Sequence, residues 1–232
     1  MSGAYFDQFN VVWVFGLTNS AIMMGLTIII VLLFLNGGDL IPKRWQSILE
    51  LTYSHFYRVI EDNLGGGGLT YLPFVVSLFF FEVCLSVLGL CPYVFTPTAH
   101  IIVTLGLSFS IIIGVTLTGF WRFKWDFFSV FMPSGAPLGL APLLVLIETV
   151  SYVSRAISLG VRLAANIAAG HLLFAILAGF GFNMLIASGP AGVLPLLVMV
   201  FITLLEVAVA VIQAYVFCLL TIIYLADTLG LH

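Results

Sequence analysis

The chain has 232 residues, of which 62% are hydrophobic and 7% are charged, and its mean hydropathy is +1.23. A soluble domain carries about 25% charged residues, so this chain has too little charge to cover a water-facing surface. Seven Lys and Arg stand against ten Asp and Glu, which leaves no basic surface for nucleic acid. The composition excludes soluble enzymes, nucleic-acid-binding proteins and secreted disulfide scaffolds, and it predicts a single membrane domain over residues 1–232.

The N-terminal segment, residues 1–40, is expected to hold the first membrane helix. No charged residue lies between Asp7 and Asp39, and a hydrocarbon core about 30 Å thick needs about 20 apolar residues in a helix. We therefore expect a helix over residues 11–35. It does not read as a cleaved signal peptide, because no basic region precedes it and no small-residue cleavage site follows.

Residues 42–62 mix charged and apolar side chains, which is typical of an amphipathic helix in the membrane interface. Residues 65–68 are four glycines and are expected to form a flexible connector. Two further membrane helices are expected within residues 71–120, over residues 71–90 and 99–120. Pro92 and Pro97 fix the backbone of the turn between them.

The basic residues before the last two segments predict the orientation of the chain. The helices expected within residues 1–120 place five cations on one side of the membrane. The positive-inside rule assigns that side to the cytoplasm, or to the matrix of a mitochondrion. The N-terminus is then expected to face the outer side. The five cations are Lys43, Arg44, Arg58, Arg122 and Lys124.

Two apolar segments near the C-terminus are too long for an upright membrane helix. Residues 142–180 and 190–228 would each extend about 55–58 Å as a helix, and a perpendicular span needs about 30 Å. They must therefore be tilted or kinked. The turn residues 187–190 predict that the two form an antiparallel hairpin within residues 141–228. The expected fold is an all-α integral membrane protein with about five membrane helices and one interfacial helix.

The hairpin segments carry polar residues that are costly in a membrane. The first holds Glu148, Arg155, Arg162, Asn166 and His171, and the second holds Glu206, Gln213, Tyr215 and Asp227. At 100° per residue, most of them form one stripe on each helix. His171 should point away from the Arg162 stripe. Either the helix twists near Gly170, or a His171–Glu206 pair lines a cavity behind the Arg162 face.

The antiparallel arrangement predicts which polar residues lie at the same level, because such pairs have a nearly constant sum of position numbers. Glu148 would lie level with Asp227, Arg162 with Gln213, and His171 with Glu206. Arginine stays protonated and cannot pass a proton on, whereas His and Glu can relay protons. The pattern predicts two half-channels that do not meet, bridged by a carboxylate on a neighbouring, moving subunit.

Two segments carry a resemblance to a known family. Residues 158–171 (SLGVRLAANIAAGH) and 206–217 (EVAVAVIQAYVF) closely resemble subunit a of F-type ATP synthases, of the mitochondrial type. The loop PYVFTPT at residues 92–98 and Gly119-Phe120 before the basic residues agree with this, so the resemblance covers about residues 72–228. It implies a proton-translocating stator subunit that is not itself catalytic. The chain has no GxxxxGK[ST] phosphate loop.

The resemblance also implies roles for individual residues. Arg162 would face the c-ring, with Gln213 beside it. His171 and Glu206 would form the half-channel that opens to the outer side, and Glu148 with Asp227 the one that opens to the matrix. Asn166 is a further candidate for the proton path.

The partners implied by the resemblance are the c-ring, the peripheral-stalk and other membrane-sector subunits, and membrane lipids. No nucleic acid, cofactor or metal is expected. The implied location is the mitochondrial inner membrane, as a multi-pass protein, or the plasma membrane of an alphaproteobacterium.

Several alternatives remain open at this point. The chain could be a self-contained secondary transporter, although no inverted repeat is visible, or a structural subunit of a respiratory complex. Glu148 and Asp227 could be helix-end residues that reach headgroup water. Asn166 could hydrogen-bond another helix, and Arg155 could be structural or functional. Separately, we expect a structural role for Glu82, and His171 alone could be a core histidine or a metal ligand.

Overall fold

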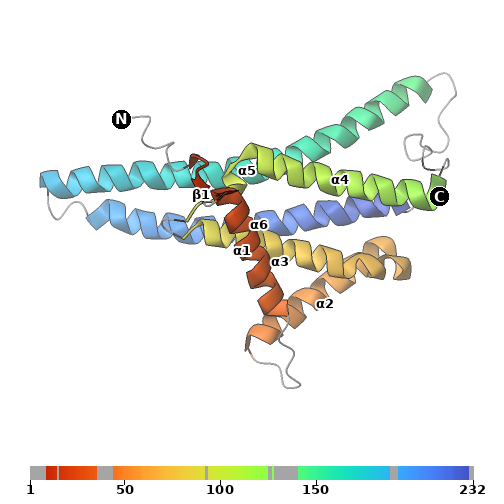
Figure 1. The fold of residues 1–232 in the computed structure, drawn as a ribbon, viewed down its shortest axis with the longest axis horizontal. Helices are drawn as coiled ribbons and strands as arrows, with labels where there is room; N and C mark the ends of the chain where they lie inside the picture. Colours follow the sequence, from red (N-terminus) through yellow and green to blue (C-terminus); the bar gives the residue numbers. More distant parts are fainter. Residues whose placement is uncertain are drawn as a thin grey trace. The chain divides into compact units, whose positions relative to one another are not determined.

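The computed structural model describes residues 9–14, 16–35, 44–91, 94–124, 127, 141–188 and 193–229, and most of these are helical (Figure 1). The α-helices are α1 Asn19–Leu35, α2 Arg44–Leu64, α3 Leu72–Gly89, α4 Ile101–Phe123, α5 Ala141–Ser188 and α6 Val193–Leu229. Two short 3₁₀ helices, η2 Gly66–Tyr71 and η3 Pro97–Ala99, flank α3. Two-residue strands β1 Trp13–Val14 and β2 Leu17–Thr18 precede α1.

The first helix begins later than the predicted residue 11. Trp13 pairs with Thr18 in an antiparallel ladder, and Gly16 in the connecting turn has a φ of 83°, which glycine adopts without steric cost. The Thr18 hydroxyl then accepts a hydrogen bond from the Ala21 amide at 3.3 Å, which satisfies a free donor at the helix start. Hydropathy alone does not register this turn, so the predicted helix was too long at its N-terminal end.

The helix predicted over residues 42–62 corresponds to α2, which mixes exposed charged residues with the fully buried Phe56 and Ile60. The tetraglycine segment differs from its prediction. Instead of forming a flexible connector, three of its glycines enter η2, which begins at Gly66. Gly68 packs so closely on α2 that a Cβ there would overlap Leu64, so at this one position the missing side chain serves close packing.

The described helices include four that are long and apolar enough to cross a membrane, and α1 is a shorter apolar helix. The chain is therefore a multi-pass membrane protein, as predicted. α5 has 48 residues and α6 has 37, so α5 exceeds its predicted length. With its 48 residues, α5 has more than twice the about 20 residues that an upright helix needs to cross a hydrocarbon core about 30 Å thick. Residues 189 and 190 of the predicted turn lie outside the described residues.

Backbone contacts divide the chain into two compact units. Unit 1 comprises residues 1–36, 80–104 and 162–215, and unit 2 comprises residues 37–79, 105–161 and 216–232. α3, α5 and α6 each contribute one part to unit 1 and another part to unit 2.

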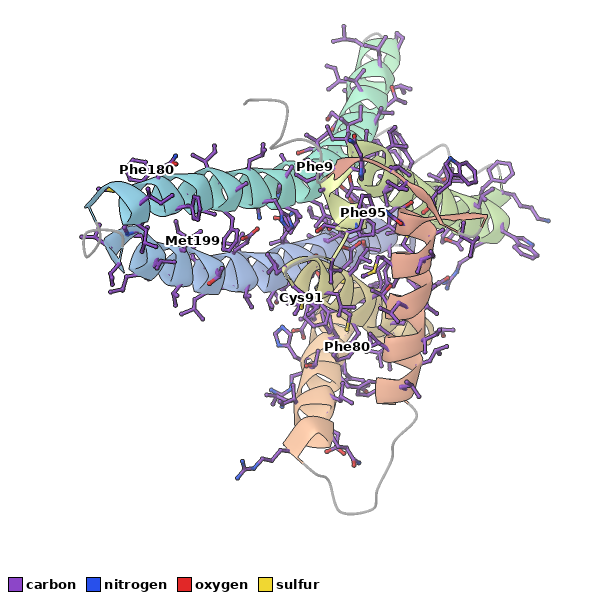
Figure 2. The ribbon with its side chains drawn as sticks, turned by 60° about the vertical axis from the view of Figure 1, so that its left-hand side comes forward. Phe9, Phe80, Cys91, Phe95, Phe180 and Met199 are labelled. Carbon is purple, nitrogen blue, oxygen red and sulfur yellow. The ribbon has the colours of Figure 1, made fainter. Side chains whose placement is uncertain are left out.

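Unit 1 contains the antiparallel hairpin of the second part of α5 and the first part of α6. The two arms lie side by side in both views, with Phe180 on α5 and Met199 on α6 (Figure 2). Gly181 faces Pro195, where an added Cβ would lie 3.3 Å from the proline Cβ, and Gly170 faces Glu206. Both pairs have the same sum of position numbers, so the predicted antiparallel register is confirmed.

Unit 2 packs the remaining parts of the long helices with α2 and most of α4. An added Cβ at Gly160 of α5 would lie 3.0 Å from the Leu105 Cα of α4, so the small residue permits close helix packing. The rings of Tyr152 and Tyr224 lie 6.2 Å apart. This α5–α6 pair has the same sum of position numbers as the pairs in unit 1.

Candidate functional site

Unit 1 holds a cavity of about 200 Å³ between α5 and α6. Its lining is apolar apart from one carboxyl and one amide side chain, those of Glu206 and Asn166. Glu206 is 8% exposed, and its Oε1 has no hydrogen-bond partner among the described residues. The lining comprises Asn166, Ile167, Ala169, Gly170, Leu173, Ile202, Leu205, Glu206 and Val209.

Gly170 determines how closely the Glu206 carboxylate approaches α5. A Cβ at this glycine would overlap the carboxylate of Glu206. A side chain at this position would therefore displace the carboxylate, and α5 continues as a helix through Gly170. Of the His171–Glu206 pair that the second alternative placed in a cavity, Glu206 lines the cavity and His171 is not among its lining residues.

His171 is held by Thr96 of the loop before η3. The His171 Nε2 lies 3.0 Å from the Thr96 Oγ1, and this hydroxyl donates its hydrogen to the Gly89 carbonyl at 2.9 Å. Because a threonine hydroxyl has one hydrogen, Nε2 must be the donor in the first bond. In a neutral imidazole, Nδ1 is then the nitrogen that can accept a proton.

His171 and Glu206 therefore share a region of unit 1 without binding each other directly. Among the described residues, no hydrogen bond or ion pair joins the two side chains, and the Phe9 ring meets the His171 ring edge-on at 6.3 Å. Sequence reasoning missed Thr96. The motif PYVFTPT indicated a turn and agreed with the family resemblance, but no spacing rule connects it with residue 171.

Arg162 and Gln213 occupy different environments in unit 1. The Arg162 side chain lies on the exposed face of α5, whereas the next two residues, Leu163 and Ala164, are fully buried. Gln213 of α6 is 7% exposed, and its Nε2 has no hydrogen-bond partner among the described residues. α5 thus carries an exposed arginine within an apolar helix.

Unit 2 holds a second cluster of charges, centred on Arg155 of α5. Its guanidinium lies 3.6 Å from the Glu148 carboxylate and 3.5 Å from the Asp227 carboxylate of α6. Nη2 also donates to the Ser151 Oγ at 3.3 Å, and the guanidinium carbon lies 5.9 Å from the Tyr224 ring centre. The predicted acidic pair is therefore bridged by a cation.

The side chains of the Arg155 cluster are partly exposed on the surface of the chain. The side chains of Arg155, Glu148 and Asp227 are 38%, 40% and 52% exposed. Exposed ion pairs contribute about 0–1 kcal/mol to stability, so stability is a weak reason for this cluster. Arg155 lies seven residues after Glu148 and on the same helix face. This spacing was the feature of the sequence that indicated a contact between the two.

Comparisons with known proteins agree with the motifs. A family described as ATP synthase A chain matches residues 18–226. The chain is 66% identical to ATP synthase subunit a of Metridium senile over 232 residues, which cover 100% of both chains. It is 46% identical over 223 residues to ATP synthase subunit a of Mycosarcoma maydis (93% of this chain, 88% of the relative). Against ATP synthase subunit a of Marchantia polymorpha it is 44% identical over 229 residues (94% and 91%). The chain therefore belongs to the ATP synthase A chain family.

Proposed function

We propose that the chain is the proton-translocating stator subunit in the membrane sector of an F-type ATP synthase. It would provide two offset half-channels and an essential arginine that faces the c-ring, and so couple proton flow to rotation and ATP synthesis. The observation that carries the proposal is the exposed Arg162 side chain on α5. Along α5, this residue stands between the Arg155 cluster and the lining of the Glu206 cavity.

The half-channel that opens to the outer side comprises Glu206, His171 and Asn166. A carboxylate in a cavity with a largely apolar lining can bind a proton and release it again. His171 is held in one orientation by Thr96, which leaves Nδ1 as the nitrogen that accepts protons. Asn166 lines the same cavity and can hold water by hydrogen bonds.

Arg162 separates the two half-channels. A guanidinium does not release its proton under physiological conditions, so it repels a hydronium ion and blocks a direct leak. It also attracts a carboxylate on a passing c subunit. Gln213, which is 7% exposed, would stand at the same level of the hairpin as the arginine, as the resemblance implies.

The half-channel that opens to the matrix comprises Glu148 and Asp227. Arg155 pairs with both carboxylates, and both of these side chains are partly exposed on the chain's surface. A proton that leaves the c-ring would pass to one of these carboxylates and from there to water in the matrix. Arg155 joins the functional set as the residue that positions Glu148 and Asp227.

ATP synthesis itself would take place elsewhere in the assembly, so the chain is not an enzyme on its own. Its partners would be the c-ring, the peripheral-stalk and other membrane-sector subunits, and membrane lipids. We place it in the mitochondrial inner membrane.

Replacement of Arg162 tests the proposal. In vesicles that contain the assembled complex, Arg162→Ala should abolish proton-driven ATP synthesis and increase passive proton leak, because the fixed charge between the half-channels is lost. Arg162→Lys should also fail, since a flexible ammonium is a poorer fixed barrier. Arg122→Ala, at the exposed end of α4, is the control. Coupled synthesis by Arg162→Ala at the parent rate would disprove the proposal.

A further inference from the structure

α3 buries a carboxylate that the proposed proton path does not use. Glu82 is 0% exposed, and neither carboxylate oxygen has a hydrogen-bond partner among the described residues. Burial of a carboxyl group without a hydrogen bond or a counter-charge is strongly unfavourable. Native proteins therefore satisfy such groups with protein atoms or ordered water. A purely packing role for this side chain would be filled better by an apolar residue.

Glu82 begins a row of polar groups on one face of α3. Ser86 follows four residues later, is 1% exposed, and its Oγ also has no hydrogen-bond partner among the described residues. Gly89 follows three residues after Ser86, so all three positions lie on the same face of the helix. Successive positions are about 4.5–6 Å apart along the axis, a gap that one water molecule bridges.

The row ends at His171. The Gly89 carbonyl accepts the hydrogen bond of the Thr96 hydroxyl at 2.9 Å, and the same hydroxyl lies 3.0 Å from the His171 Nε2. All of these residues belong to unit 1. Thr98 and His100, just after Thr96, add two more buried polar atoms without a hydrogen-bond partner among the described residues, Oγ1 and Nε2.

We propose that a water-filled branch of the outer half-channel runs along α3, and that Glu82 is a proton-binding group within it. The branch connects Glu82 through water, Ser86 and the Thr96 hydroxyl with His171. When His171 gains a proton at Nδ1, it gives its Nε2 hydrogen to the Thr96 hydroxyl, which turns from the Gly89 carbonyl and passes its own hydrogen through water and Ser86 to the Glu82 carboxylate. The reverse transfers return the proton to His171, so Glu82 stores a proton for the half-channel. This inference rests on the proposed function, because it extends the same half-channel.

Removal of the titratable group tests the role of Glu82. In vesicles with the assembled complex, Glu82→Gln keeps the shape of the side chain but cannot bind the proton, so it should lower proton-driven ATP synthesis several-fold. Glu82→Asp should restore most of the rate. Glu50→Gln, an exposed carboxylate of α2, is the control and should keep the parent rate. A parent rate for Glu82→Gln at every outer-side pH would overturn the role of Glu82.

Water access along α3 is tested separately with silver ions, which enter where water enters and bind a thiol. In a variant with Cys84, Cys91 and Cys218 replaced by alanine, Ser86→Cys should make proton-driven synthesis sensitive to silver added on the outer side. Leu85→Cys is the matched control, because Leu85 is equally buried at 2% exposure but points away from the row. Equal insensitivity of the two variants would overturn the branch.

The outcomes separate this inference from the proposed function. If Arg162→Ala retains coupled synthesis, the proposed function fails. If Arg162→Ala uncouples the complex while Glu82→Gln and Ser86→Cys behave like the parent, only the branch along α3 fails. Should Glu82→Gln prevent assembly, the silver experiment on Ser86→Cys decides.

Discussion

Two glycines decide where the side chains of Glu206 and Thr96 lie. Gly170 leaves the space that the Glu206 carboxylate occupies. Gly89 lets Thr96 approach α3 closely, because a Cβ there would overlap the Thr96 side chain, and Thr96 in turn holds His171. A helix backbone at close range thus positions both titratable groups of the cavity region.

Replacement of Gly170 by alanine should displace the Glu206 carboxylate without unfolding the chain. The overlapping atoms are the flexible end of a side chain, and alanine favours a helix by about 1 kcal/mol over glycine. We expect normal assembly with a large loss of proton-driven ATP synthesis in vesicles. Gly25→Ala on α1, where an added Cβ meets nothing within 4 Å, should keep the parent rate. A parent rate for Gly170→Ala would show that the position of the carboxylate is unimportant.

Replacement of Arg155 by glutamine should affect function more than stability. The ion pairs with Glu148 and Asp227 are exposed, so their loss costs about 0–1 kcal/mol, whereas both carboxylates lose the group that positions them. A double-mutant cycle with Asp227→Asn, read as synthesis rates, should show non-additive effects, because the two charges are in contact. Arg122→Gln is the control. Strictly additive effects would contradict the bridge.

Sequence patterns predicted the charged and amide residues of the sites but only part of their contacts. A charge in an apolar helix stands out because it is costly there, so Arg162, Glu206 and Asp227 were visible. Thr96 was not, because a hydroxyl in a loop has little cost until its hydrogen-bond partner is known. The bridge from Arg155 to two carboxylates also depended on side-chain conformations that spacing does not determine.

At the scale of helices, the hairpin register was the most reliable prediction. The contacts of Gly181 with Pro195 and of Gly170 with Glu206 have the constant sum of position numbers that an antiparallel hairpin predicts. A short connection fixes the register of two antiparallel helices. The predictions for the start of α1 and for the tetraglycine segment were wrong. In both segments, local backbone geometry decided the structure, through the β1–β2 turn and through the packing of η2 on α2.

A cysteine cross-link tests the hairpin register. In a variant without the native cysteines, Gly181→Cys with Pro195→Cys should form a disulfide on mild oxidation. The added Cβ lies 3.3 Å from the Pro195 Cβ, close to the about 3.5–4.5 Å that disulfides need. Non-reducing electrophoresis after cleavage between the two helices measures the product. Gly181→Cys with Leu194→Cys, at a neighbouring exposed position, should not cross-link, and efficient cross-linking of that pair instead would contradict the register.

At the scale of the whole molecule, the exposed surface of the chain is suited to contact with lipid and with partner subunits. Many large hydrophobic side chains are exposed on its described surface, including Trp121 at 87% and Ile102 at 86%. Such surface is stable only against lipid or another subunit. The two proposed half-channels do not join, so the chain needs a moving carrier beside it to transport protons.

The chain alone should therefore not transport protons. Purified chain in liposomes with an imposed potassium diffusion potential should give no proton uptake above protein-free liposomes, as read with an internal pH-sensitive dye, because Arg162 blocks the direct path. Co-reconstitution with the c-ring should produce the flux. Proton or ion exchange by the chain alone would instead support a self-contained secondary transporter.

Composition and spacing by themselves determined the membrane class, the long hairpin, its register and the polar residues on it. These features follow from the thickness of the bilayer, the cost of buried charge and the helical repeat, which are local or general constraints. The tertiary structure alone decided which side chains meet: Thr96 with His171, Arg155 with two carboxylates, and Glu82 with no protein hydrogen-bond partner among the described residues. The contacts of Thr96 with His171 and of Arg155 with Asp227 join segments distant in the sequence, which spacing along the chain does not predict.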